Sequence, residues 1–203
     1  MRMAKVEYQE ARELADRASI RQDLTFVVET LSRLADLLRE GSEDHVLLRS
    51  YWSAALVAYV RCFASGKRVG LSESVFEGIA GAEEPAVDVH RFYKHMRDKH
   101  VAHSVYPFEQ VEVGLALSPP ASQERRVEGV ATLSMSLTAP VLEGVESLRE
   151  LALIAREKNR AEAKRLEEAV LRVGQQQDLD ALYGKATMRT TVPESKAAGK
   201  PRT

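Results

Sequence analysis

The chain has 203 residues, of which 44% are hydrophobic and 29% charged, so it can bury a core of ordinary globular composition in one domain. A formal net charge of -1 gives no whole-protein argument for binding nucleic acid or a membrane surface. The single cysteine, Cys62, excludes an internal disulfide and agrees with a reducing, cytoplasmic setting. The N-terminal residues lack the apolar core of a signal peptide, and no apolar run of about 18 residues occurs, so we expect no membrane span.

Apolar residues at helical spacing predict that the first forty residues form two helices or one kinked helix. Ser19 and Gln22 match a capping box, which favours a fresh helix start at Ser19. Gly41 stands where the C-terminal cap of this region is expected. The stripe between these points is regular: Leu24, Val27, Val28, Leu31, Leu34, Ala35 and Leu38.

A second helix is predicted from a cap at Ser42 to about Phe63. It is rich in apolar residues, so we expect Cys62 to be a buried structural thiol rather than a nucleophile. Arg49 and Arg61 are its charged residues. The pattern leaves open whether they reach solvent by their ends or line a polar cleft.

A short helix over residues 72–80 is expected next, and Pro85 then opens a helix that carries the most unusual stretch of the chain, residues 87–104. Its predicted apolar face consists of Ala86, Val89, Phe92, Tyr93, Met96, Val101 and Ala102. The same stretch holds four of the five histidines and a cluster of basic residues, His90, Arg91, Lys94, His95, Arg97, Lys99, His100 and His103, opposed by Asp88 and Asp98. This local cationic cluster is where the sequence indicates chemistry.

Alternating residues after this helix predict a β-hairpin at about 110–138 with a long polar loop. The two runs of apolar residues are Val111, Val113, Leu115 and Leu117, then Leu133, Met135 and Leu137. Because an isolated hairpin is only marginally stable in water, we expect it to lie on the helices or on a partner.

Thr138 and Pro140 suit the start of a last helix, which becomes charge-rich from Arg156 to Glu168. Beyond Gly174 no apolar period remains, which is typical of a disordered tail. The sequence therefore predicts a mainly α protein. Its helical bundle domain spans residues 1–172 and carries one β-hairpin insertion, and a flexible basic tail spans residues 173–203.

Metal binding is the first function to weigh for the histidines. Ligands on one helix face need steps of three or four residues, and His100 and His103 satisfy this. The steps from His90 to His95 and from His95 to His100 are five residues and turn the side chains by about 140°. We expect no metal site and no cofactor, and a two-histidine site completed by a distant carboxylate stays open.

The second function is metal-free phosphate chemistry. An arginine can hold a phosphate with two hydrogen bonds, and a histidine can transfer a proton near neutral pH. Together the two side chains are sufficient to cleave a phosphodiester if they meet around one phosphate.

Arg97 and Asp98, followed by His103 after a short spacer, resemble the motif of the HEPN family. The resemblance implies a helical bundle that dimerises and brings two copies of the motif into one cleft. It further implies a metal-independent ribonuclease, often a toxin or defence effector. Arg97 would then bind the scissile phosphate, His103 would act as general acid or base, and the RNA 2'-hydroxyl would be the nucleophile.

The remaining candidates support these two residues. Asp98 would orient Arg97 or a histidine, His100 would position the substrate, and Lys94 and Lys99 would bind neighbouring phosphates. Arg97 and His103 project about 120° apart on an ideal helix, so we expect a homodimer that pairs Arg97 of one chain with His103 of the other. The expected partners are RNA, a second copy, and an antitoxin or other protein, without a membrane.

Two other interpretations remain. One is a non-catalytic helical dimer that binds a protein or nucleic acid through the same positive surface. The other is purely structural, because a helix dipole by itself favours Lys, Arg and His at a C-terminal end. Arg97 would then form a plain salt bridge, and His103 would cap the last carbonyl groups.

Overall fold

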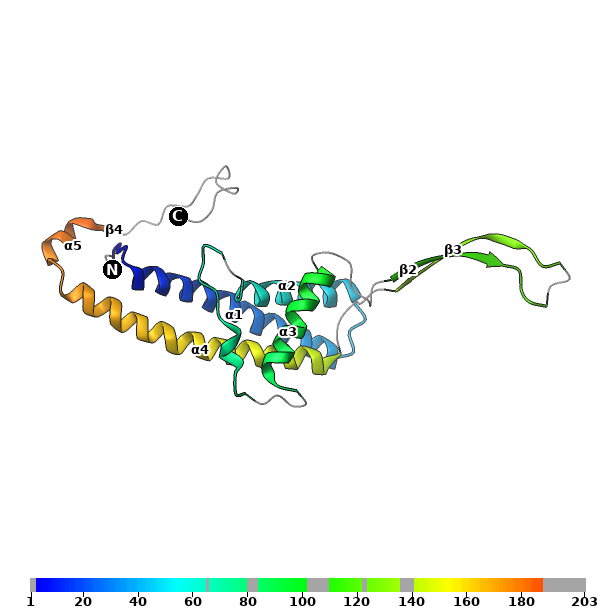
Figure 1. Ribbon diagram of the computed structural model, residues 1–203, viewed down its shortest axis with the longest axis horizontal. Helices are drawn as coiled ribbons and strands as arrows, with labels where there is room; N and C mark the ends of the chain where they lie inside the picture. Colours follow the sequence, from blue (N-terminus) through cyan, green and yellow to red (C-terminus); the bar gives the residue numbers. More distant parts are fainter. Residues whose placement is uncertain are drawn as a thin grey trace.

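Helices form the body of the protein in the computed structural model, which describes residues 3–64, 66–79, 84–101, 110–121, 124–135 and 141–187 (Figure 1). The helices are α1 (Gln9–Arg39), α2 (His45–Arg61), α3 (Ala86–Met96), α4 (Leu142–Gln175) and α5 (Leu179–Lys185), with a 3-10 helix at Glu73–Phe76 and a π-helical turn at Arg97–Val101. The strands are β1 (Met3–Ala4), β2 (Gln110–Leu117), β3 (Val127–Met135) and β4 (Ala186–Thr187).

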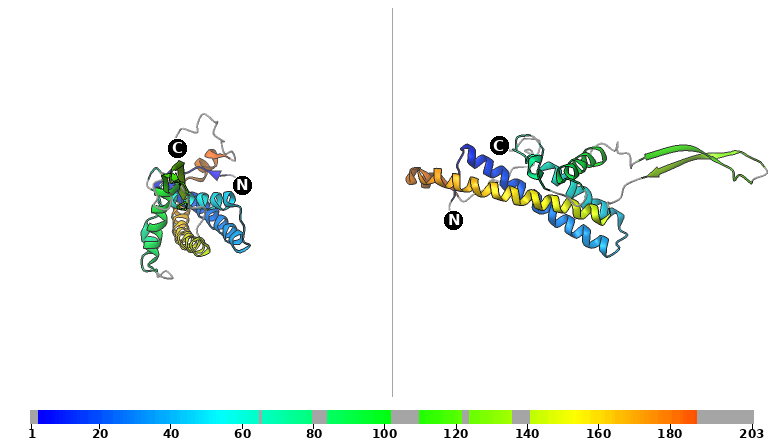
Figure 2. Two further views of the ribbon diagram at one scale, coloured as in Figure 1. Left: turned by 90° about the vertical axis from the view of Figure 1, so that its right-hand side faces the viewer. Right: turned by 60° about the horizontal axis from the view of Figure 1, so that its bottom comes forward.

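The two longest helices, α1 and α4, lie side by side and run in opposite directions (Figures 1 and 2). With 31 and 34 residues they extend about 46 and 51 Å. Their shared core includes Leu24, Leu31 and Leu148, and the periodic stripe predicted for α1 is buried or half-buried throughout. Away from this core, the Asn159 side-chain amide donates a hydrogen bond to the backbone oxygen of Arg17 at 3.0 Å.

α1 is a single continuous helix, so the predicted fresh start at Ser19 is wrong. Ser19 lies inside the helix, where its hydroxyl accepts a hydrogen bond from Arg68 at 3.1 Å instead of capping a helix. The predicted end at Gly41 is confirmed. Gly41 has a φ of 71°, and the amides of Gly41 and Ser42 donate to the carbonyls of Leu38 and Leu37, which is the Schellman arrangement.

α2 completes the main core. Its N-terminal cap is Asp44, which accepts from the Leu47 amide at 2.9 Å, and not Ser42 as predicted. Trp52 is 1% exposed and meets the ring of Tyr93 edge-on at 5.9 Å. Cys62 is completely buried, as the sequence predicts for a structural thiol, and burial raises the pKa of Cys62 to about 12.

α3 crosses α2 and α4 at a steep angle (Figure 1). Its buried face consists of Ala86, His90, Tyr93 and Met96, and the Tyr93 hydroxyl donates to the Gly144 carbonyl at 2.7 Å. Phe92 was predicted to belong to this face but is 48% exposed. Phe92 directly precedes buried Tyr93, and one step along an α-helix turns the side chain by about 100°. The Phe92 side chain therefore points away from the buried face.

The predicted hairpin is confirmed: β2 and β3 pair antiparallel in a sheet of their own. It projects away from the end of the bundle as an arm (Figures 1 and 2). Apolar side chains along it, such as Val113 at 71% and Leu115 at 64%, are largely exposed. The described part of the hairpin therefore does not lie on the helices, which was one of the two places expected for it.

The C-terminal region also differs from the expected flexible tail over 173–203. α4 continues to Gln175, and Asp178 caps α5 by accepting from the Asp180 amide at 3.1 Å. β4 then pairs antiparallel with β1, with Met3 opposite Thr187, so this sheet joins segments from both ends of the chain. The rest of the expected tail, 188–203, lies outside the described residues.

Candidate functional site

Arg97 and Asp98 open the π-helical turn that follows α3. An Nη1 hydrogen of Arg97 is donated to Oδ1 of Asp98 at 2.6 Å, and the two side chains are 30% and 43% exposed. Both groups therefore reach the surface while holding each other. Single turns of π-helix within helices occur often at functional sites.

The surface beside Arg97 is basic. Lys94 and His95 in the last turn of α3 and Lys99 in the π-helical turn are all exposed. Because these side chains share one short helical segment, they can offer several positive groups to an anionic polymer. The candidate residues Arg97, Asp98, Lys94 and Lys99 are thus brought to one region, as their proximity in the sequence implies.

Two other candidates cannot be placed. The side chain of His100 and the whole of His103 lie outside the described residues. The proposed pairing of Arg97 with His103 consequently stays a prediction.

His90 has a different character from the other histidines of this stretch. It is 1% exposed, its Nδ1 lies 2.8 Å from the Tyr59 hydroxyl, and its ring packs against Phe63 and Phe76 at centroid distances of 4.4 and 5.0 Å. Burial, assisted by the nearby charge of Lys94, lowers the pKa of His90 to about 4. His90 is therefore a neutral core residue at pH 7 that anchors α3 to α2.

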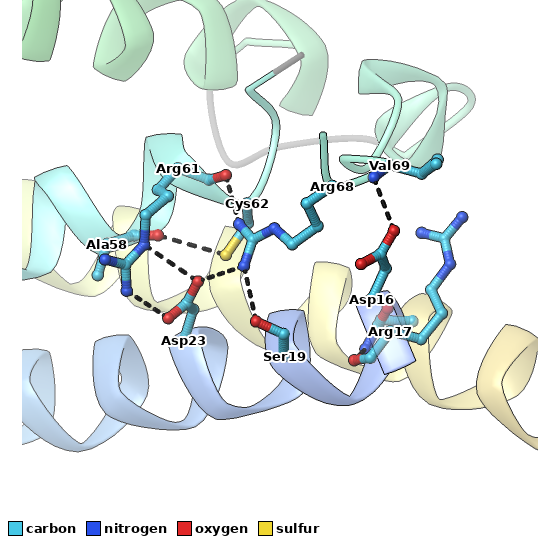
Figure 3. Close-up of polar contacts among 10 residues, drawn as sticks. Asp16, Arg17, Ser19, Asp23, Ala58, Arg61, Cys62, Arg68 and Val69 are labelled. Carbon is cyan, nitrogen blue, oxygen red and sulfur yellow. Dashed lines mark hydrogen bonds and ion pairs between the residues drawn. The ribbon is translucent and has the colours of Figure 1, made fainter. Parts of the chain in front are cut away.

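A second polar cluster joins α1, the end of α2 and the loop that follows it (Figure 3). Asp23 accepts hydrogen bonds from both Arg61 and Arg68, with the Arg68 contact at 2.8 Å. Arg68 also donates to the backbone oxygen of Arg61 at 2.6 Å. Although burial acts to raise it, these hydrogen bonds lower the pKa of Asp23 below its usual value.

A groove of about 1020 Å³ runs beside this cluster. Charged residues of both signs line it, namely Lys5, Arg12, Arg61, Lys67, Arg68, Glu7, Asp16 and Asp23. Because Asp23 on α1 accepts hydrogen bonds from both Arg61 and Arg68, the cluster links α1 to the end of α2 and to the loop that follows it. No pattern in the sequence predicts these contacts, because Asp23 is 38 residues from Arg61 and 45 residues from Arg68. Arg61 lines the groove, which is one of the two positions that the sequence leaves open for it.

Metal ligands do not gather among the described residues, where no group of three or more His, Cys, Asp or Glu side chains could hold an ion. Within the same residues, no helix is both long enough and apolar enough to cross a membrane. No protein-family profile, curated protein or solved structure matches this chain.

Proposed function

We propose that this protein is a HEPN-like, metal-independent endoribonuclease, acting as a toxin or defence effector, with Arg97 and His103 as its central residues. The observation that carries the proposal is the position of Arg97 on a partly exposed, non-α turn at the end of α3. Lys94 and Lys99 supply exposed positive charge on either side of it in the sequence. Exposed positive groups of this kind can form electrostatic contacts with the phosphates of an RNA backbone.

The chemistry needs no metal and no nucleophilic side chain. The RNA 2'-hydroxyl loses its proton to a general base and attacks the adjacent phosphorus, while the 5'-oxygen leaves and accepts a proton. The products are a 2',3'-cyclic phosphate and a 5'-hydroxyl end. His103 would transfer the proton, and Arg97 would stabilise the charge that grows on the phosphate oxygens.

A shared site in a homodimer would bring Arg97 of one copy to His103 of the other. Asp98 holds the guanidinium of Arg97 in one orientation at 2.6 Å. Lys94, Lys99 and His100 would bind or position the flanking nucleotides. An antitoxin or other protein partner would act by covering this basic surface.

The test is RNA cleavage in EDTA by wild type, Arg97→Ala and His103→Ala. We expect cyclic-phosphate products from wild type, with losses of about 10²–10³-fold for the arginine variant and about 10²–10⁴-fold for the histidine variant. Arg91→Ala is the matched control, because Arg91 is an exposed arginine of α3 whose charge is engaged by Glu73 at 2.8 Å and Asp88 at 3.2 Å. It should retain cleavage.

A substrate with a single 2'-deoxy nucleotide provides a second control, since cleavage at that position should stop. All variants must keep the helical circular-dichroism signal and the oligomeric state of wild type. If wild type leaves several RNAs intact, or if Arg97→Ala cleaves as fast as wild type, the catalytic proposal is wrong.

The alternative function is a non-catalytic helical dimer that binds a protein or nucleic-acid partner. The ion pair between Arg97 and Asp98 favours this alternative, because Asp98 already neutralises part of the positive charge of Arg97 within the same chain. RNA binding that weakens in Arg97→Ala, Lys94→Ala and Lys99→Ala, without cleavage by wild type, would support this alternative.

A further inference from the structure

The hairpin formed by β2 and β3 carries a continuous apolar face. Residues directly opposite each other in an antiparallel pair point to the same face, and the register places Val111, Val113, Leu115 and Leu117 opposite Ser134, Thr132, Val130 and Val127. A β-bulge next to Leu117 leaves Glu128 without an opposite residue, which brings Val127 to the face of Val130. We call these eight residues the valine face.

The valine face is exposed in the single chain. Its six large apolar side chains are between 56% and 71% exposed. Together these residues expose roughly 700 Å², backbone atoms included, which is at the upper end of the about 300–600 Å² found for the largest apolar patch on a typical monomer. The hydrogen bonds and ion pairs described for the hairpin are internal to it and involve Ser118, Glu124, Arg126 and Glu128.

The exposed valine face needs another apolar surface to pack against. A two-stranded hairpin is marginally stable in water at best, so packing of its apolar face on another surface is needed to stabilise it. The valine face carries no charged side chain, so its occupant must also be uncharged over a similar area. Among the described residues, the exposed apolar side chains of the helices, such as Phe26 on α1, Val46 on α2 and Phe92 on α3, are spread over different elements.

We propose that the valine face docks on the valine face of a second copy of this chain. The two faces are identical in size and chemistry, as a two-fold symmetric interface requires. Full burial of the six large apolar residues would contribute roughly 700 Å² per copy, close to the about 800 Å² per partner of stable interfaces. The two hairpins would stack at about 10 Å with their strands aligned within about 30°, which makes a small β-sandwich with Val113 and Leu115 in its middle rows.

This inference depends on the exposure of the hairpin and not on the chemistry of Arg97. It also places the association on an arm away from the helices, so the bundle of each copy keeps its own core. A charge in the valine face should therefore break the dimer without unfolding the helices.

The test is sedimentation velocity of wild type, Val113→Lys and Ala131→Lys from about 1 to 100 µM, without RNA. Val113 lies on the valine face. Ala131 is the matched control, because it lies opposite Gly114 on the other face of the same hairpin and is also exposed. We expect wild type to dimerise, Val113→Lys to raise the dissociation constant at least about tenfold, and Ala131→Lys to change it less than about threefold.

Hydrogen exchange supplies a second readout. Amides of 110–117 and 127–135 should be protected in concentrated wild type and lose that protection on dilution and in Val113→Lys. The proposal is overturned by a wild type that stays monomeric at 100 µM, by a dimer that Val113→Lys leaves intact, or by equal effects of both lysine variants. A monomeric wild type would also remove the shared site of the ribonuclease proposal, whereas a dimer that Val113→Lys leaves intact, or equal effects of both lysine variants, would overturn the arm interface alone.

Discussion

His90 gives a sharp prediction about the pH dependence of stability. Its pKa is about 4 in the native protein and 6.5 as the ordinary value expected after unfolding. As the pH falls, the unfolded chain binds a proton at this histidine before the native protein does. The contribution of neutral His90 to the free energy of unfolding is therefore fully present above about pH 6.5 and is lost as the pH falls towards 4. Between about pH 7.5 and 5.0, this one residue should lower the free energy of unfolding by about 2 kcal/mol.

His90→Asn removes the titration while keeping a polar group near Nδ1 for the Tyr59 hydroxyl, which lies 2.8 Å away in wild type. The assay is urea unfolding followed by circular dichroism at several pH values in that window. Wild type should lose about 2 kcal/mol more than the variant on acidification, whatever the difference between them at pH 7.5. Parallel pH profiles for the two proteins would refute the reasoning, because the buried neutral histidine would then not be the titrating group.

Two other predictions concern the loop after α2. Asp23→Asn removes the counter-charge of Arg68, whose side chain is 19% exposed, and should lower the free energy of unfolding by about 1–3 kcal/mol. The control is Asp36→Asn, because Asp36 forms an exposed ion pair with Arg39. This variant should change the free energy of unfolding by less than about 0.5 kcal/mol in the same urea titrations. Gly70→Ala should cost about 1–3 kcal/mol because a Cβ there would lie 2.7 Å from the carbonyl oxygen of Ala64. Gly66→Ala, where a Cβ meets nothing within 4 Å, should be neutral or slightly stabilising, and equal effects at both glycines would contradict the steric argument.

The parts of the fold that the sequence predicts well are those with a repeating pattern. The stripe from Leu24 to Leu38 gives α1 its buried face, and the alternation from Val111 to Leu117 gives β2, since in each case many residues report the same period. Single-position signals were weaker. Ser19 satisfies a capping pattern, yet the apolar stripe continues through it, and packing on α4 and the bond from Arg68 outweigh that local preference.

Contacts between distant segments leave no periodic trace. Nothing in the residues around Asp23 indicates Arg61 and Arg68. The helical spacing of Ala86, His90 and Tyr93 is compatible with a buried His90, but it does not indicate the contact with Tyr59 on α2. The alternation of β2 predicts a strand but not what covers it, and only the structure shows that the described hairpin does not lie on the helices. The basic segment around Arg97 was predictable because its residues are neighbours in the chain, and the role of His103 stays a prediction.

The position of Trp52 allows the helical core to be studied separately from the hairpin formed by β2 and β3. It is the single tryptophan of the chain, and it is buried in α2 against Tyr93 of α3. The described residues of the hairpin, 110–117 and 124–135, contain no aromatic side chain. Tryptophan fluorescence therefore reports on the helical core and not on the described hairpin, so an unchanged tryptophan signal in Val113→Lys would show that the substitution leaves the helices undisturbed.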